Sequence, residues 1–202
     1  MTQLKTTIDA DSAAQKELNA LMALALALQA CAERDVSAAF AALARLLREA
    51  PEHAAARHLL GALYAQAGNV EESLEQMHGA LEIDPDMVLL RFQYGLLLLT
   101  SGNPGEAAAI WSPLAVLGDD HVLNRFSAGM LRMAAGEYDA ARRALTLAHA
   151  ENTIMPALDY DLLAALAALP PEVDMPAYDD SKPQHDGQHV LLSSYHQSDT
   201  LN

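Results

Sequence analysis

The 202-residue sequence has little cysteine and few basic residues. Its one cysteine, Cys31, excludes an internal disulfide and a site built from several cysteines, which fits a reducing compartment. Only 12 Lys and Arg stand against 27 Asp and Glu, for a formal net charge of −15. Binding to nucleic acid or to an anionic membrane needs clustered cations, so neither partner is expected.

The sequence also lacks long apolar runs. The N-terminus has no basic segment followed by an apolar stretch and a small-residue cleavage site, so a secretory signal is not expected. The apolar run around residues 96–99 is too short to span a bilayer. A cytoplasmic protein without membrane insertion is therefore expected. Aromatic residues make up only 5% of the chain, and a hydrophobic content of 51% that is mostly Ala and Leu favours packed helices.

Glycines recur in the sequence with a period of 34 residues. This spacing relates three sets: Gly61, Gly95 and Gly129; Gly68, Gly102 and Gly136; and Arg57, Arg91 and Arg125. A 34-residue period is typical of one helix–turn–helix unit. The second glycine set is expected to end each first helix in the left-handed conformation. The arginines are expected to pack their stems between helices and to pair locally.

The first glycine set falls in the middle of each first helix, where glycine costs about 1 kcal/mol relative to alanine. We expect close helix crossing to compensate for this cost. The facing positions of the second helices are also small: Ser73, Ala107 and Ala141. Both helices of each unit are expected to be about four turns long.

These residues resemble the tetratricopeptide repeat (TPR). Residues 54–85 match it closely, with Pro85 at the expected place. In the next unit Asp119 replaces this proline and Trp111 fills the large core position, and the following unit has Arg132 where a large apolar residue belongs. A first unit, from Ala20, has Arg34 where the turn glycine should be. The resemblance implies an all-α, right-handed solenoid of helical hairpins.

The repeat frame predicts the organisation of the chain. A flexible N-terminus at 1–12 precedes repeats at 13–151, with units at about 20–53, 54–87, 88–121 and 122–151. Ser12 and Gln15 form a possible capping box at the first helix, which is expected to run to about Glu33. Thr153 and Pro156 mark the start of a capping helix at 152–169. Residues 170–202 are an acidic tail that is expected to be flexible.

The resemblance implies that four positions of each first helix line a concave groove. Fifteen of the sixteen residues at these positions are apolar, which favours an apolar peptide or helix of a partner protein as the ligand. The expected binding residues are His58, Ala62, Leu89, Phe92, Leu96, Leu99, Leu123, Phe126, Met130 and Met133. The function expected is that of an adaptor or chaperone, and replacing Phe92 and Phe126 by alanine should weaken binding without unfolding the chain.

Two alternatives remain open at this stage. The same apolar face could be a permanent interface in a structural subunit or a homodimer. The architecture is also similar to that of the chaperones of type III secretion translocators, although the long tail departs from them. A clamp for acidic C-termini is not expected, because its basic positions hold Leu24, Leu28, Leu59, Leu89 and Gln93.

The tail contains one apolar island in polar surroundings, formed by Val190, Leu191, Leu192 and Tyr195. It is a candidate to dock into the groove of its own or a neighbouring chain. No catalytic constellation, phosphate-binding loop or cofactor site is found, so an enzyme is not expected. A metal site from the tail residues His185, Asp186, His189 and His196 is not expected either, because no rigid second shell supports it.

Overall fold

A computed structural model describes residues 15 and 17, residues 19–30 and residues 33–171. These residues form helices joined by short turns, with no strand among them, and the prediction of an all-α, TPR-like fold with a C-terminal capping helix is confirmed. The chain divides into two compact units, residues 1–90 and residues 91–202.

The first unit is built from helical residues 19–30 and from three further helices. They are α2 (Val36–Glu49), α3 (Ala54–Gln66) and α4 (Val70–Ile83). Helix α3 packs against both α2 and α4. Small and branched side chains from the first three helices form one core, whose buried members are Ala27, Ala30, Ala39, Leu43, Leu46, Ala56, Leu60 and Leu63. The alanines let these helices approach closely, and the leucines fill the space between them.

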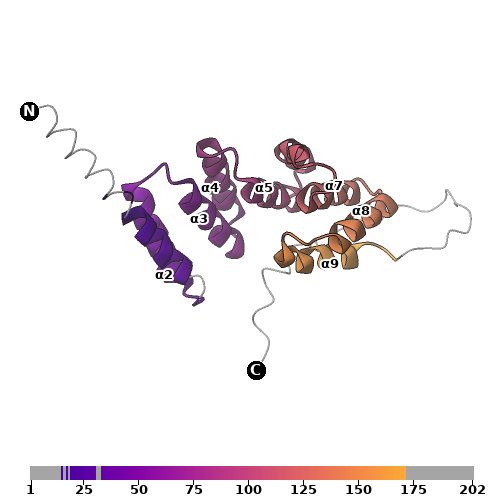
Figure 1. Ribbon diagram of the computed structural model, residues 1–202. Helices are drawn as coiled ribbons and strands as arrows, with labels where there is room; N and C mark the ends of the chain where they lie inside the picture. The colour runs from indigo at the N-terminus through magenta and orange to yellow at the C-terminus, as the bar shows by residue number, and fades with distance from the viewer. Residues whose placement is uncertain (1–14, 16, 18, 31–32, 172–202) are drawn as a thin grey trace, which may run out of the picture. The chain divides into compact units, whose positions relative to one another are not determined.

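Helix α5 (Val88–Thr100) leads into the second unit (Figure 1). Helix α6 (Pro104–Trp111) faces α5 and is continued by the 3-10 helix η1 (Ser112–Leu117), and α7 (Val122–Ala134) forms the next hairpin with α8 (Tyr138–Ala150). A short 3-10 turn, η2 (Pro156–Leu158), then leads into the capping helix α9 (Asp159–Ala168), which packs on α8. Large side chains fill the core of this unit, among them Phe92, Trp111, Leu114, Leu123, Phe126, Met130, Leu145 and Leu162.

Four turns end in the same way, at intervals of 34 residues. Gly68, Gly102 and Gly136 have φ angles of 78°, 86° and 77°, as the sequence predicts. Arg34 stands in the same register and has a φ of 59°. In each turn the next residue donates its N–H to a carbonyl five residues earlier, as Asn69 does to Tyr64 (2.9 Å) and Asp35 to Ala30 (2.8 Å). The first repeat therefore ends its first helix with the same turn as the other three repeats, although it has Arg34 where they have glycine.

Arg34 generates the first stability prediction, because a left-handed conformation costs a residue with a Cβ about 1–2 kcal/mol. Arg34→Gly is expected to raise the free energy of unfolding by about 1 kcal/mol, since part of the gain is lost to the larger backbone entropy of unfolded glycine. Gly68→Arg is the matched control and should lower it by about 1 kcal/mol. Urea unfolding of both variants measures the effect, and a destabilised Arg34→Gly protein would contradict it.

The mid-helix glycines allow close crossing, as expected, but the side chains that fill the space differ from the expectation. A methyl group on Gly61 would lie 2.9 Å from Met77 Cγ, and one on Gly129 would lie 2.7 Å from Leu145 Cγ. On Gly95 it would lie 2.6 Å from Trp111 Cδ1. The small residues of the second helices have a lesser part: the Ser73 hydroxyl donates to the Gly61 carbonyl (2.7 Å). Each glycine makes room for a large side chain one turn further along the second helix.

Gly95→Ala should lower the free energy of unfolding by about 2–3 kcal/mol, because the rigid indole of Trp111 cannot move away from the added methyl group. Gly61→Ala is the matched control. The thioether of Met77 is flexible and alanine is a better helix former, so the change should be within about 1 kcal/mol. Equal losses in the two variants, measured by urea unfolding, would show that the indole is not the obstacle.

The second helix of the third repeat, at about residues 88–121, is shorter than predicted. Helix α6 ends at Trp111 after 8 residues, and η1 continues the chain for 6 residues until Gly118, whose φ is 91°. Pro113 explains the break, since it has no N–H to donate to the Ala109 carbonyl and its ring would clash there. The hydroxyl of Ser112 donates to that carbonyl instead (2.9 Å).

Side chains cap three helix starts. Asp35 accepts the N–H of Ala38 (2.9 Å) at the start of α2. At the start of α3, Nδ1 of His53 accepts the N–H of Ala56 (3.2 Å). Nδ1 of His121 accepts the N–H of Leu123 (3.2 Å) at the start of α7. Each bond satisfies an amide that has no partner within its helix.

Candidate interaction surface

The expected groove positions of the second unit are mostly buried. Phe92, Leu123 and Phe126 are each 1% exposed and Met130 is fully buried. The ring of Phe92 lies against those of Phe126 (centroids 5.1 Å apart) and Trp111 (6.0 Å). The indole Nε1–H of Trp111 also donates to the Phe92 carbonyl (2.9 Å). These residues are core in this conformation.

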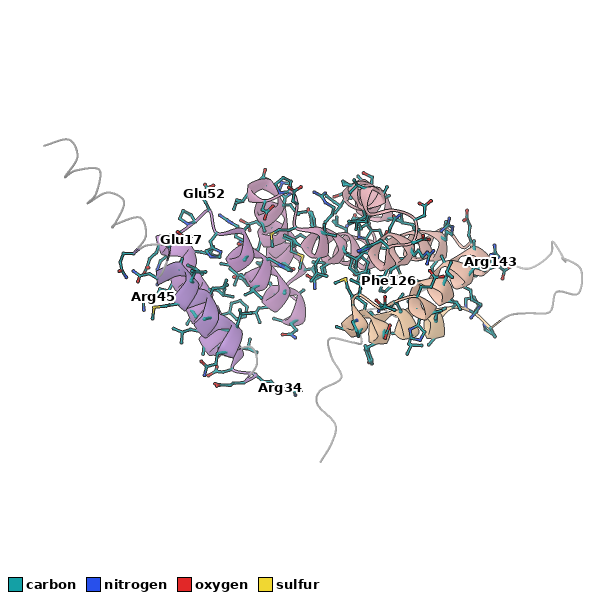
Figure 2. The ribbon with its side chains drawn as sticks, in the orientation of Figure 1. Glu17, Arg34, Arg45, Glu52, Phe126 and Arg143 are labelled. Carbon is teal, nitrogen blue, oxygen red and sulfur yellow. The ribbon has the colours of Figure 1, made fainter. Side chains whose placement is uncertain are left out.

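Phe126 projects from α7 into the interior of the second unit (Figure 2). A ligand cannot contact such a side chain without displacing part of the core. Leu96, Leu99 and Met133 are half-buried and keep some surface. Only this last group offers expected groove positions of the second unit to a ligand.

In the first unit the equivalent positions are more open. Leu21 and Leu28, on the helix at residues 19–30, are 56% and 49% exposed, and Leu24 between them is half-buried. On α3 the corresponding side chains are half-buried and keep some surface: Ala55, His58, Ala62 and Ala65. Leu89, near the boundary between the units, is 38% exposed. None of these side chains carries a fixed charge, so the open positions form an uncharged, largely apolar set.

The sequence analysis missed two apolar residues on the same helix. Met22 and Leu26 are 59% and 60% exposed, because the helix at residues 19–30 buries its alanine face instead. A helical wheel of this segment puts Ala27 and Ala30 on the buried side, Met22 and Leu26 beside that side, and Leu21 and Leu28 opposite it. This signal was present in the sequence, but the repeat frame directs attention only to the groove positions.

The arginines at the repeat spacing pair locally, as expected. Nε of Arg57 donates to the Pro51 carbonyl (3.0 Å), and Nη1 of Arg91 donates to the Ile110 carbonyl (3.4 Å). Arg125 bridges Asp120 and Glu151, and its side chain is only 14% exposed. These guanidinium groups connect helices and turns within their own units, so they do not form a ladder for an acidic ligand.

A polar cluster fixes the start of the capping helix. The Asn152 side-chain amide donates to the Asp159 carboxylate (2.8 Å) and to the Met155 carbonyl (2.7 Å), and His149 Nδ1 lies 3.2 Å from the same carboxylate. The Asn152 hydrogen bond, with a smaller contribution from His149, lowers the pKa of Asp159. The ionised carboxylate is therefore the form that stabilises this junction, and acid weakens it.

Two further findings concern metal ions and membranes, and several residues singled out in the sequence lie outside the described part of the chain. Residues 15, 17, 19–30 and 33–171 contain no cluster of three or more His, Cys, Asp or Glu side chains able to hold a metal ion. No helix of this part is both long and apolar enough to cross a lipid bilayer. Ser12 and Cys31 lie outside the described residues, and so do the tail residues His185, Asp186, His189, Val190, Leu191, Leu192, Tyr195 and His196.

Burial changes the expected effect of replacing the phenylalanines. Phe126→Ala should lower the free energy of unfolding by about 3–5 kcal/mol, because it removes a ring and leaves a cavity beside Phe92 and Trp111. Leu89→Ala is the control and should cost less than about 1 kcal/mol, since Leu89 is 38% exposed. Thermal or urea unfolding measures both, and a stable Phe126→Ala protein would argue against a core position.

The comparisons with known proteins agree with this architecture. Residues 30–86 match the family model for the tetratricopeptide repeat, whereas no curated protein sequence matches the chain. Among solved structures, PilF from Pseudomonas aeruginosa superposes with a TM-score of 0.62 at 15% identity, over 76% of this chain and 68% of its own.

Two further structures are similar. YrrB, a TPR protein with an unusual peptide-binding site, has a TM-score of 0.58 at 17% identity, over 77% of this chain and 79% of its own. A MamA fragment from Desulfovibrio magneticus RS-1 has a TM-score of 0.59 at 11% identity, over 73% and 81%. At such identities the likeness concerns the fold. Residues 30–86 are thus a matched tetratricopeptide repeat segment, and the turns at 34-residue intervals and the helical hairpins continue a fold of that kind through the described chain.

Proposed function

We propose that this protein is an adaptor or chaperone that binds an apolar segment of a partner protein through its first unit. The tetratricopeptide repeat is in general a non-catalytic scaffold for protein–protein interaction, and that coarse assignment follows from the fold. The finer proposal rests on one observation. The open repeat positions of the first unit, Leu21, Leu28, Ala55, His58 and Ala62, present an uncharged and largely apolar surface.

This surface suits an amphipathic helix or an extended apolar peptide. Two leucines that are about half exposed lie seven residues apart on one helix, so they share a face. Water covers this face at a cost that an apolar ligand would remove. Burying roughly 400 Å² of ligand surface gives a gross gain of about 10 kcal/mol at 25 cal/mol/Å². Ordering and association costs leave a dissociation constant in the micromolar range.

The remaining predicted groove residues have two roles in this proposal. Leu89 is partly exposed and belongs to the apolar positions of the first unit, whereas Leu96, Leu99 and Met133 keep partly exposed surface within the second unit. Phe92, Leu123, Phe126 and Met130 support these positions from the core and do not contact the ligand. Their replacement would act on stability first.

The charge of the chain narrows the partner further. With a net charge of −15, the protein attracts segments that carry basic residues beside their apolar ones and repels acidic ones. A partner segment with leucines on one face and lysines or arginines around it is therefore favoured. The cytoplasm stays the expected compartment, on the argument from the lone Cys31.

A structural subunit or homodimer is the second candidate, and one observation favours it. The helix at residues 19–30 exposes apolar side chains on two sides, with Leu21 and Leu28 on one side and Met22 and Leu26 on the other. A second copy of the chain could cover this helix permanently. The two candidates differ in solution mass: a dimer whose mass is independent of concentration favours the subunit.

A labelled 15-residue amphipathic peptide of Leu, Ala and Lys tests the binding proposal by fluorescence anisotropy. Leu21→Asp with Leu28→Asp should weaken binding at least tenfold, because two charges would be buried against an apolar ligand. The control is Val116→Asp, at a site 87% exposed in the second unit, which adds acidic charge to a residue that is not part of the proposed surface. A peptide of equal composition with the leucines dispersed controls for charge attraction. Equal binding by both protein variants would refute the site.

A further inference from the structure

The capping helix α9 has an apolar outer face. Its buried residues Leu162 and Ala165 lie on one side, followed by Leu169 just beyond the helix. On the opposite side Tyr160 is 60% exposed and Leu163 is 50% exposed, and Ala167 continues the same face. The helix is therefore apolar on the side that packs and on the side that does not.

This face is unusual at the end of a repeat array. The last helix of such an array normally turns a polar side to water, because no further repeat covers it. The acidic residues of α9 do not supply that polarity. Asp159 is engaged by Asn152 and His149, and Asp161 is half-buried, which raises the pKa of its carboxyl group. From Leu162 to Ala168 the helix carries no charged or polar side chain.

The chain that leaves α9 begins at a fixed point. The guanidinium group of Arg142, on α8, donates to the Pro170 carbonyl, and Leu169 is 6% exposed. The tail therefore starts beside the C-terminal end of α9. Beyond Pro171 the sequence continues for 31 residues, in which Val190, Leu191, Leu192 and Tyr195 form the apolar island.

The length of the tail allows the island to reach α9. About twenty residues separate Pro170 from Val190, and at about 3.3 Å per residue they span up to about 66 Å. Helix α9 has 10 residues, or about 15 Å of length at 1.5 Å per residue. A tether of this kind holds the island near the helix at an effective concentration of order millimolar. A second copy of the chain would compete at only micromolar concentration, well below the effective concentration of the tethered island. Two copies of this strongly acidic chain would also repel each other.

We infer that the island of the C-terminal tail docks on the outer face of α9 in the same chain, against Tyr160, Leu163 and Ala167. The docked segment supplies the polar outer surface that α9 lacks, since the Ser193 and Ser194 hydroxyls and the residues that flank the island are hydrophilic. In this arrangement the tail ends the repeat array and prevents another copy from stacking on it. The inference is independent of the proposed function, because it concerns a surface of the second unit and needs no partner protein.

Cysteine pairs in the full-length chain test the contact. In a Cys31→Ser background, one variant carries Leu163→Cys with Leu192→Cys, and the control carries Val116→Cys with Leu192→Cys. Both partner sites are exposed and lie in the same unit, so the Val116 variant measures how fast the tail reacts with an exposed cysteine outside the proposed docking face. Oxidation at micromolar protein concentration is followed on non-reducing gels, and mass spectrometry locates the disulfide.

The expected result is an intramolecular disulfide that forms at least tenfold faster in the Leu163 variant than in the Val116 control. Equal rates would overturn the inference, and so would a disulfide-linked dimer, which would assign the face to a second copy. A second measurement uses the chain with its own cysteine. Leu191→Asp with Leu192→Asp should increase hydrogen exchange in α9 several-fold and leave α3 unchanged, whereas unchanged exchange in α9 would count against docking.

Discussion

Three helix hairpins depend on a glycine, Gly61, Gly95 or Gly129, that leaves room for a large side chain of the facing helix. Met77, Trp111 and Leu145 occupy this space, and they recur at the 34-residue period of the glycines they face. The contact offsets the cost of about 1 kcal/mol that a glycine imposes on a helix. Trp111 adds a buried hydrogen bond to the Phe92 carbonyl, which fixes the indole in place. This hairpin is therefore the least able to tolerate a change at its glycine.

The same packing decides where apolar surface is left for partners. In the second unit, the ring of Phe92 lies between Trp111 and Phe126, so the large residues of the first helices face one another and not water. In the first unit, the small core residues Ala27 and Ala56 need little space, and the leucines of residues 19–30 remain partly outside. The unit with the smaller core side chains is thus the one in which more of these leucine side chains stay exposed.

The repeat period was sufficient to predict the turn positions, because a left-handed turn constrains its residue through sterics alone. Arg34 shows the strength of that constraint, since it adopts the turn conformation without being glycine. The period could not predict the short α6, which depends on Pro113, a residue outside the repeat pattern. The groove positions were the least predictable, since a list of apolar residues cannot show that Phe92 and Phe126 cover each other.

The histidine caps described above use the same kind of acceptor at two equivalent helix starts. Nδ1 of each ring accepts an amide N–H through its lone pair. His53 and His121 occupy the same place in two repeats, one in each unit. An aliphatic residue at either position would therefore leave one amide of that helix start without its acceptor, and each unit depends on one such ring.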